Sequence, residues 1–193
     1  HVYDWASITK IAGPTPLLMH LYEQKTINLD WPFSRIWHPF ANSNKKDITL
    51  RQILAHQAGL RSGIPFHLNA LRTKSADSAS IFHQGPTEMH TLEVAPNLFV
   101  LTNYKQTMFD QIRDSKLTSK TGYEYSDLGF HLFPTLIEQL SNRNYEELLY
   151  SMFFEPLGAT TACYNAYKHL PLSEIAPTEM DDQFRNTLVH GYV

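Results

Sequence analysis

The sequence has few charged residues, a single cysteine and no long apolar run, and these absences exclude whole classes of protein. Sixteen basic and nineteen acidic residues leave a net charge of −3, and the longest basic cluster is the pair Lys45 and Lys46. Such a chain lacks the basic surface that binds nucleic acids or anionic membranes. No apolar run approaches the roughly 18 residues that span a bilayer. We therefore expect the partner to be a small molecule or another protein.

Disulfide, metal and cofactor sites are not indicated either. Cys163 has no second cysteine to pair with, which fits a reducing cytosol or a bacterial periplasm that uses few disulfides. The ten histidines include no pair at the i, i+4 spacing of a helical zinc site, so we expect no metal and no cofactor. The chain begins at His1 without a start methionine or a basic and apolar leader, which predicts an internal cut or a processed end.

The composition nevertheless predicts a packed, mainly helical domain. Apolar residues make up 42% and aromatic residues 12% of the 193 residues, enough for one domain or part of one. Turn signals and apolar periodicity predict five helices, over residues 6–22, 50–57, 103–114, 127–140 and 144–153. A Thr49–Gln52 capping box begins the second helix and Gly59 stops it, and an Asn144–Glu147 cap begins the last. Proline predicts a fault near Pro14 in the first helix and a bend at Pro134 in the fourth.

Two stretches do not fit this helical pattern. Residues 67–100 mix polar and scattered apolar side chains and predict a long loop or lid excursion of the kind that often shapes a site. Residues 187–193 read as the start of a strand, which cannot form a sheet alone. Alternation typical of strands is scarce elsewhere.

Ser7 and Lys10 are the first candidates for chemistry. They stand three residues apart at a predicted helix start, so both side chains lie on one face and the amine can reach the hydroxyl. Unpaired N–H groups at that helix start could also stabilise an oxyanion. Ser43 and Lys46 repeat the spacing, but in a polar loop where the lysine would stay hydrated and useless as a base. The alternative for Ser7 and Lys10 is a helix cap followed by an exposed lysine.

Tyr125 and Asp127 add a phenol and a carboxylate before another apolar helix. A tyrosine near a cation loses its proton at lower pH than in water, and it can then act as a general base toward a serine. The alternative is structural: Ser126 or Asp127 would cap the helix, and Tyr125 would be a half-buried aromatic residue.

Taken together, these motifs resemble the serine β-lactamase and penicillin-binding-protein superfamily, in particular its class C and esterase-like branch. The stretches that carry the resemblance are residues 3–10 (YDWASITK), 48–60 (ITLRQILAHQAGL), 125–130 (YSDLGF) and 155–158 (EPLG). With residues 175–193 included, the chain most closely resembles the module fused behind family-3 glycoside hydrolases in Bacteroidetes-type bacteria.

The resemblance implies an acyl-enzyme mechanism and a role for each candidate residue. Ser7 would be the acylated nucleophile, Lys10 its activating neighbour, and Tyr125 the base and later the acid. The family usually has Asn where this chain has Asp127, which would bind substrate; a carboxylate can only accept hydrogen bonds, so it suits a substrate with an amide or hydroxyl donor better than an anionic one. Residues 120–122 (KTG) imitate the family's third motif, but they stand five residues before Tyr125 and read as a loop turn.

The same resemblance implies an α+β fold of the β-lactamase/transpeptidase type, of which residues 1–193 form a single incomplete domain. The chain would represent mainly the helical region, with most sheet strands, the second oxyanion donor and the true third motif missing. A periplasmic or cell-envelope location is implied as well.

The leading interpretation is a serine hydrolase that cleaves an amide or an ester. Its alternative is a catalytically silent accessory or cell-wall-binding module fused to a family-3 glycosidase of the β-N-acetylglucosaminidase type. In either case the ligand is a small molecule, a peptide or a glycan.

Overall fold

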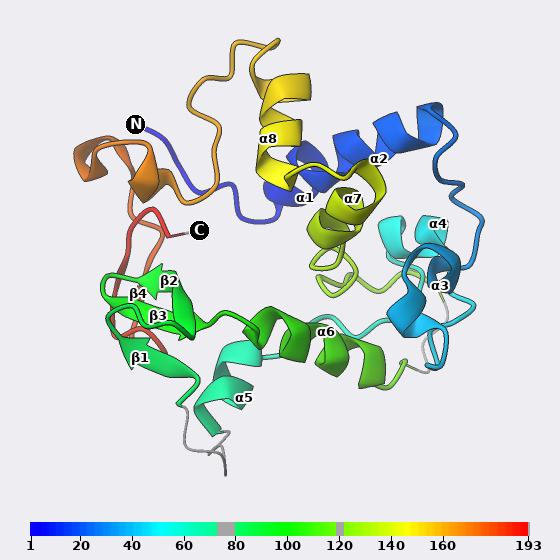
Figure 1. The fold of residues 1–193 in the computed structure, drawn as a ribbon, viewed down its shortest axis with the longest axis horizontal. Coiled ribbons are helices and arrows are strands. Elements are labelled where there is room, and N and C mark those ends of the chain that lie inside the picture. The colour runs from blue at the N-terminus through cyan, green and yellow to red at the C-terminus, as the bar shows by residue number, and fades with distance from the viewer. Residues whose placement is uncertain (73–79, 119–121, 193) are drawn as a thin grey trace. The chain divides into compact units, whose positions relative to one another are not determined.

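The computed structural model describes residues 1–72, 80–118 and 122–192, and the chain in it forms two compact units (Figure 1). One unit consists of His1–Ala6, Pro65–Met108 and Thr161–Val193, and the other of Ser7–Ile64 and Phe109–Thr160. All four candidate residues, Ser7, Lys10, Tyr125 and Asp127, belong to the second unit. None of the helices in the described ranges has the length and apolar character needed to cross a membrane.

The second unit is helical. Its helices are α1 (Ile8–Ala12), α2 (Pro14–Glu23), α3 (Phe33–Ile36), α4 (Leu50–Leu54), the end of α6 (Tyr104–Asp114), α7 (Phe133–Ser141) and α8 (Tyr145–Leu149), with a 3-10 turn at His38–Phe40 and a π-helical turn at Tyr150–Phe154. Phe33, Leu50, Leu132, Leu136 and Ile137 are among its fully buried side chains. The predicted fault lies at Gly13, between α1 and α2, where Pro14 begins the second helix.

The local cap signals are confirmed where they start helices. Thr49 and Gln52 form the reciprocal capping box of α4, and the Asn144 side chain accepts a hydrogen bond from the Glu147 amide at the start of α8. Each cap supplies acceptors for amides that have no partner inside the helix.

Two predicted helix bounds are wrong. The helix expected over residues 127–140 begins only at Phe133, because Pro134, which lacks an N–H, is accommodated in the first turn rather than as a bend in the interior. The helix expected over residues 50–57 ends at Leu54. In both places the residues that were expected to be helical form turns instead, and those turns carry side chains of the candidate site.

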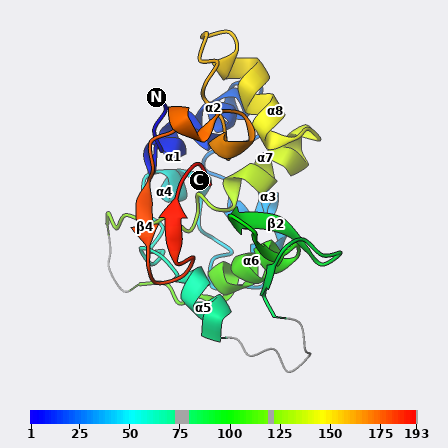
Figure 2. The ribbon, with the colours of Figure 1, turned by 90° about the vertical axis from the view of Figure 1, so that its left-hand side faces the viewer.

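The first unit contains the strands. β1 (Phe82–Gln84), β2 (His90–Ala95) and β3 (Leu98–Leu101) form an antiparallel sheet in the order β1-β3-β2, preceded by α5 (Phe66–Arg72). β4 (Glu179–Asp181) pairs antiparallel with β5 (Thr187–Val189), the two strands that Figure 2 shows next to each other. Two 3-10 turns, Ala166–Lys168 and Leu172–Glu174, stand before them.

The irregular excursion predicted for residues 67–100 is therefore corrected. Outside residues 73–79, which are not described, this stretch holds most of α5 and a three-stranded sheet around the small core of Ala70, Ile81, Val100 and Tyr104. The strand predicted at the C-terminal end is found, and β4 supplies the partner that the sequence did not reveal.

Candidate active site

Ser7 and Lys10 lie together on α1. Ser7 occupies the position before the first helical residue, but its side chain makes no capping hydrogen bond, so the hydroxyl is not used to start the helix. The Lys10 Nζ atom donates a hydrogen bond of 2.9 Å to Ser7 Oγ, and only 15% of the Lys10 side chain is exposed. The alternative interpretation, in which Ser7 caps the helix and Lys10 is exposed, does not describe this pair.

Tyr125 and Asp127 come to the same two groups from a turn more than a hundred residues further along the chain. The Tyr125 hydroxyl donates a hydrogen bond of 2.9 Å to Ser7 Oγ. The Lys10 ammonium forms an ion pair of 2.7 Å with Asp127 Oδ1. The structure therefore brings all four sequence-predicted residues into one cluster, joined by two hydrogen bonds and an ion pair.

Lys10 carries the positive charge of the cluster. Burial alone would lower the pKa of Lys10, but the hydrogen bonds and negative charges of Asp127 and Tyr125 outweigh it and raise that pKa above 10.5. Lys10 is thus a cation that donates a hydrogen bond to Ser7 Oγ and forms an ion pair with Asp127. A protonated lysine cannot accept the serine proton, so its activating effect is that of a charge and a donor.

Tyr125 is the group better suited to accept a proton. Hydrogen bonds with Lys10 and Ser7, helped by the Lys10 charge, lower the pKa of Tyr125 below 10, and burial and the Asp127 charge oppose this only in part. With its hydroxyl intact Tyr125 donates to Ser7. Once it is ionised, the same contact reverses, and the Ser7 hydroxyl donates to the phenolate.

His56, which the sequence analysis did not identify as a site residue, holds in place the turn that carries Tyr125 and Asp127, called the Tyr125 turn below. The His56 amide donates to Ile53 O and the Gln57 amide to Gln52 O, the pattern of a Schellman motif, which puts His56 in the left-handed region at φ 55°. Its Nδ1 accepts a hydrogen bond of 3.1 Å from the Ser126 amide, and its ring lies 4.4 Å from that of Tyr125, centroid to centroid. The sequence gives no signal for this role, because Gly59, three residues later, marks the helix end that the sequence predicts.

The protonation state of His56 follows from these contacts. Burial and the Lys10 charge lower the pKa of His56 below 6.5, so the ring is neutral at pH 7 with its proton on Nε2. Protonation at acid pH would put a second N–H against the Ser126 amide and remove the acceptor that holds the turn.

Further contacts fix the same turn to the segment after α4. The Asp127 amide donates to Ser62 O at 3.0 Å, and the buried Ser126 hydroxyl donates to Arg61 O at 2.5 Å. Gly129 packs so closely on α4 that a Cβ added there would overlap the Ile53 side chain. Only glycine allows this approach, which sets the position of Tyr125 and Asp127 relative to α4.

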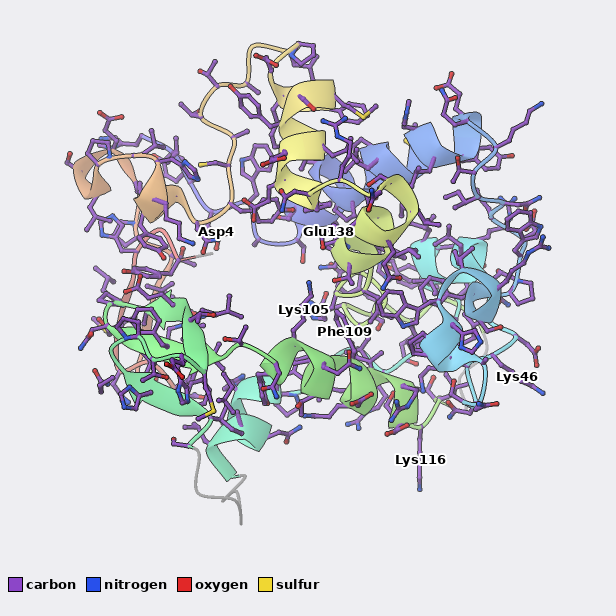
Figure 3. All side chains as sticks on the ribbon, viewed as in Figure 1. Asp4, Lys46, Lys105, Phe109, Lys116 and Glu138 are labelled. Atoms are coloured by element: carbon purple, nitrogen blue, oxygen red, sulfur yellow. The ribbon has the colours of Figure 1, made fainter. Side chains whose placement is uncertain are left out.

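The second serine–lysine pair has a different environment. The Ser43 hydroxyl donates to Phe40 O at 2.9 Å, and Lys46 is an exposed side chain at the edge of the molecule (Figure 3). The buried lysine here is its neighbour Lys45, whose Nζ donates to Asn44 Oδ1 at 2.8 Å and to the carbonyls of Arg113 and Ser115. Those carbonyls belong to the end of α6 and the residue after it, so Lys45 has a structural role.

Two other expectations concern the imitated third motif and metal binding. Lys120 and Thr121 of the imitated third motif lie outside the described residues, so only Gly122 of that motif can be located. Within residues 1–72, 80–118 and 122–192, no three histidine, cysteine, aspartate or glutamate side chains come together in a group that could hold a metal ion.

Comparisons with known proteins identify the family and the fold of the chain. The family model described as Beta-lactamase matches residues 1–168. No curated protein sequence matches the chain significantly. Among solved structures, the octameric penicillin-binding protein homologue from Pyrococcus abyssi is 18% identical with a TM-score of 0.59, over 95% of this chain and 37% of that one.

Two further structures share the fold. The D-amino acid amidase from Ochrobactrum anthropi SV3 is 20% identical with a TM-score of 0.59, over 100% of this chain and 47% of that one. The class C beta lactamase from Rhodobacter sphaeroides is 15% identical with a TM-score of 0.54, over 98% of this chain and 48% of that one. The chain thus spans less than half the length of each of the three. It belongs to the beta-lactamase family and has the β-lactamase/transpeptidase-like fold that its sequence motifs predict.

Proposed function

We propose that this chain carries the nucleophile of a serine hydrolase that cleaves an amide or an ester through an acyl-enzyme on Ser7. The observation that supports this most is the pair of hydrogen bonds on one oxygen: Ser7 Oγ receives Lys10 Nζ and the Tyr125 hydroxyl, each at 2.9 Å. The family match, to a group of hydrolases, supports the reaction type.

The proposed chemistry assigns one task to each group. Ionised Tyr125 accepts the Ser7 proton as Oγ attacks the substrate carbonyl carbon, which gives a tetrahedral adduct. The C–N or C–O bond then breaks, and the leaving group takes the proton from Tyr125. Water, deprotonated by the same phenolate, later attacks the acyl-enzyme and releases Ser7. Lys10 stays protonated throughout and stabilises the phenolate by its charge.

Covalent labelling tests the proposal. A fluorophosphonate offered to the full chain is expected to phosphonylate Ser7 with loss of fluoride, because among the described residues Ser7 is the serine with both a cationic donor and a phenol on its oxygen. Peptide mapping by mass spectrometry locates the label. Ser7→Ala should abolish the labelling and Ser43→Ala should leave it unchanged.

Labelling at Ser43, or at no serine, would contradict the proposal. The latter result is the one expected of a catalytically silent accessory or cell-wall-binding module. The cell-envelope location and the fused family-3 glycosidase stay predictions from the sequence resemblance, and the genomic sequence that encodes this chain tests the fusion directly.

A further inference from the structure

Asp127 presents two different oxygens. Its Oδ1 is buried in the ion pair with Lys10, yet 43% of the side chain is exposed. The exposure therefore lies on the other side of the carboxylate, which carries Oδ2. Within the part of the chain that the structure describes, no group donates a hydrogen bond to Oδ2. An ionised carboxylate oxygen of this kind is an acceptor only.

The charge balance of the cluster gives this oxygen a preference among ligands. The Lys10 ammonium is neutralised by Asp127, and Tyr125 adds a negative charge when it ionises to act as base. His56 contributes no positive charge at pH 7, because burial and the Lys10 charge lower its pKa. In the working state, these four side chains around Ser7 carry a net negative charge. A carboxylate on the substrate would be repelled, and a cation would be attracted.

The distances place the Asp127 carboxylate near a short substrate on Ser7. Ser7 Oγ and Asp127 Oδ1 are both within hydrogen-bond distance of the same Lys10 nitrogen, at 2.9 and 2.7 Å. An amine on the carbon next to a scissile carbonyl is separated from the carbon that Ser7 attacks by a single atom. A group attached there is close to the Asp127 side chain when the carbonyl is close to Ser7 Oγ.

We propose that Asp127 is a specificity-determining residue whose outer oxygen binds a protonated amine beside the scissile carbonyl, so that the site favours aminoacyl amides and esters. This inference rests on the proposed function, since it uses Ser7 as the nucleophile. An acyl group with a carboxylate in the same place is disfavoured. An asparagine at this position would bring the net charge of these four side chains in the working state to zero and would remove the preference.

A matched pair of boronic acids tests the proposal without the need for turnover. Boronic acids accept a serine oxygen to give a tetrahedral adduct, and the serine proton passes to Tyr125. The two probes are 1-aminoethylboronic acid and isopropylboronic acid, which differ by an ammonium group in place of a methyl group. Their affinities are measured on the full chain as protection of Ser7 against fluorophosphonate labelling.

The readout is the ratio of the two affinities within each variant, because loss of the Lys10 ion pair changes the absolute rates as well. We expect this ratio to fall about tenfold from the wild type to Asp127→Asn, close to the lower end of measured couplings between close charges. Asp47→Asn, which removes an exposed carboxylate from the loop before α4, should keep the wild-type ratio.

Two results would overturn the inference, and they differ in what else they refute. If Ser7 is labelled but the ratio is the same in the wild type and Asp127→Asn, the specificity role is wrong and the hydrolase proposal stands. If Ser7 is not labelled at all, the proposed function fails and this inference fails with it.

Discussion

Ser7 with Lys10 and Ser43 with Lys46 have the same spacing in the sequence but different surroundings in the fold. Around Ser7, a turn from a distant part of the chain brings Tyr125 and Asp127 onto the serine and the lysine. Around Ser43, the hydroxyl is taken by a main-chain carbonyl and Lys46 is exposed. The comparison teaches that a serine three residues before a lysine becomes a candidate nucleophile only when a second segment supplies the groups that set its charge.

Lys10 and Lys45, the least exposed lysines of the two regions, differ in the same way. Asp127 and Tyr125 raise the pKa of Lys10, whereas burial lowers the pKa of Lys45 to about 8, with only a partial compensation from the charge of Asp114. Lys10 therefore has carboxylate and phenol partners that favour its charge. The three acceptors of Lys45 are an amide side chain and two backbone carbonyls. One lysine is adapted to hold a charge beside a serine and the other to hold the end of α6.

Loss of Lys10 is the largest effect that the comparison predicts. Lys10→Ala should slow fluorophosphonate labelling of Ser7 by about 10² to 10⁴-fold, the range for loss of a positioned catalytic group, because Tyr125 then loses the cation that lowers its pKa. Lys46→Ala is the matched control and should label at the wild-type rate. Equal labelling rates in the two variants would remove the distinction between the two pairs.

A substitution at Gly129 tests whether the packing of the turn with Tyr125 and Asp127 against α4 is what activates Ser7. Gly129→Ala forces a methyl group into the Ile53 side chain, and overpacking of this kind costs about 1–3 kcal/mol. We expect a lower midpoint of urea unfolding and slower labelling of Ser7. Gly63→Ala is the control, since a Cβ there meets nothing within 4 Å and its unfolding midpoint should stay close to that of the wild type. A Gly129→Ala variant with wild-type stability and labelling would show that this contact does not position the turn.

Lys45 should affect stability but not the reaction. Lys45→Met leaves the carbonyls of Arg113 and Ser115 without their buried donor, which costs about 1–3 kcal/mol of unfolding free energy. Labelling of Ser7 per folded molecule should be unchanged. Slower labelling of the folded variant would mean that the two regions are not independent.

The pH dependence of stability gives Lys45 a second test. Because its folded pKa is about 8 against an ordinary 10.5, the unfolded chain binds more protons between those values, and this residue makes stability rise with pH across that window. Lys45→Met should lack the rise. Lys10 acts in the opposite sense: its raised pKa gives stability that is complete below pH 10.5 and is lost as the pH passes its folded value.

Local signals predicted the capped helix starts, and tertiary contacts decided much of the rest. The caps at Thr49 and Asn144 and the break before Pro14 involve residues within a few positions of one another, so the sequence alone shows them. The strands of residues 82–101 were missed for a physical reason. β2 has irregularities in its pairing with β3 between His90 and Leu92 and between Glu93 and Ala95, and these interrupt the alternation by which a strand is usually found.

In the candidate site, too, local features could be predicted from the sequence and tertiary contacts could not. The spacing of Ser7 and Lys10 places both on one helix face, and the YSD motif identified Tyr125 and Asp127. The sequence could not show that Lys10 keeps its charge, since that depends on Asp127 more than a hundred residues away. Nor could it show the role of His56, which depends on the left-handed helix end that aims its ring at the Ser126 amide.

The central claim is that Tyr125, with its pKa lowered by Lys10, takes the proton of Ser7. The most direct measurement is the rate of fluorophosphonate labelling of Ser7 against pH in the wild type and in Tyr125→Phe. In the wild type the rate should rise with pH to a plateau, with a midpoint below 10, because the phenolate is the active form. Tyr125→Phe should be slow and should lack that rise. A rise of the same size and midpoint in Tyr125→Phe would contradict the account.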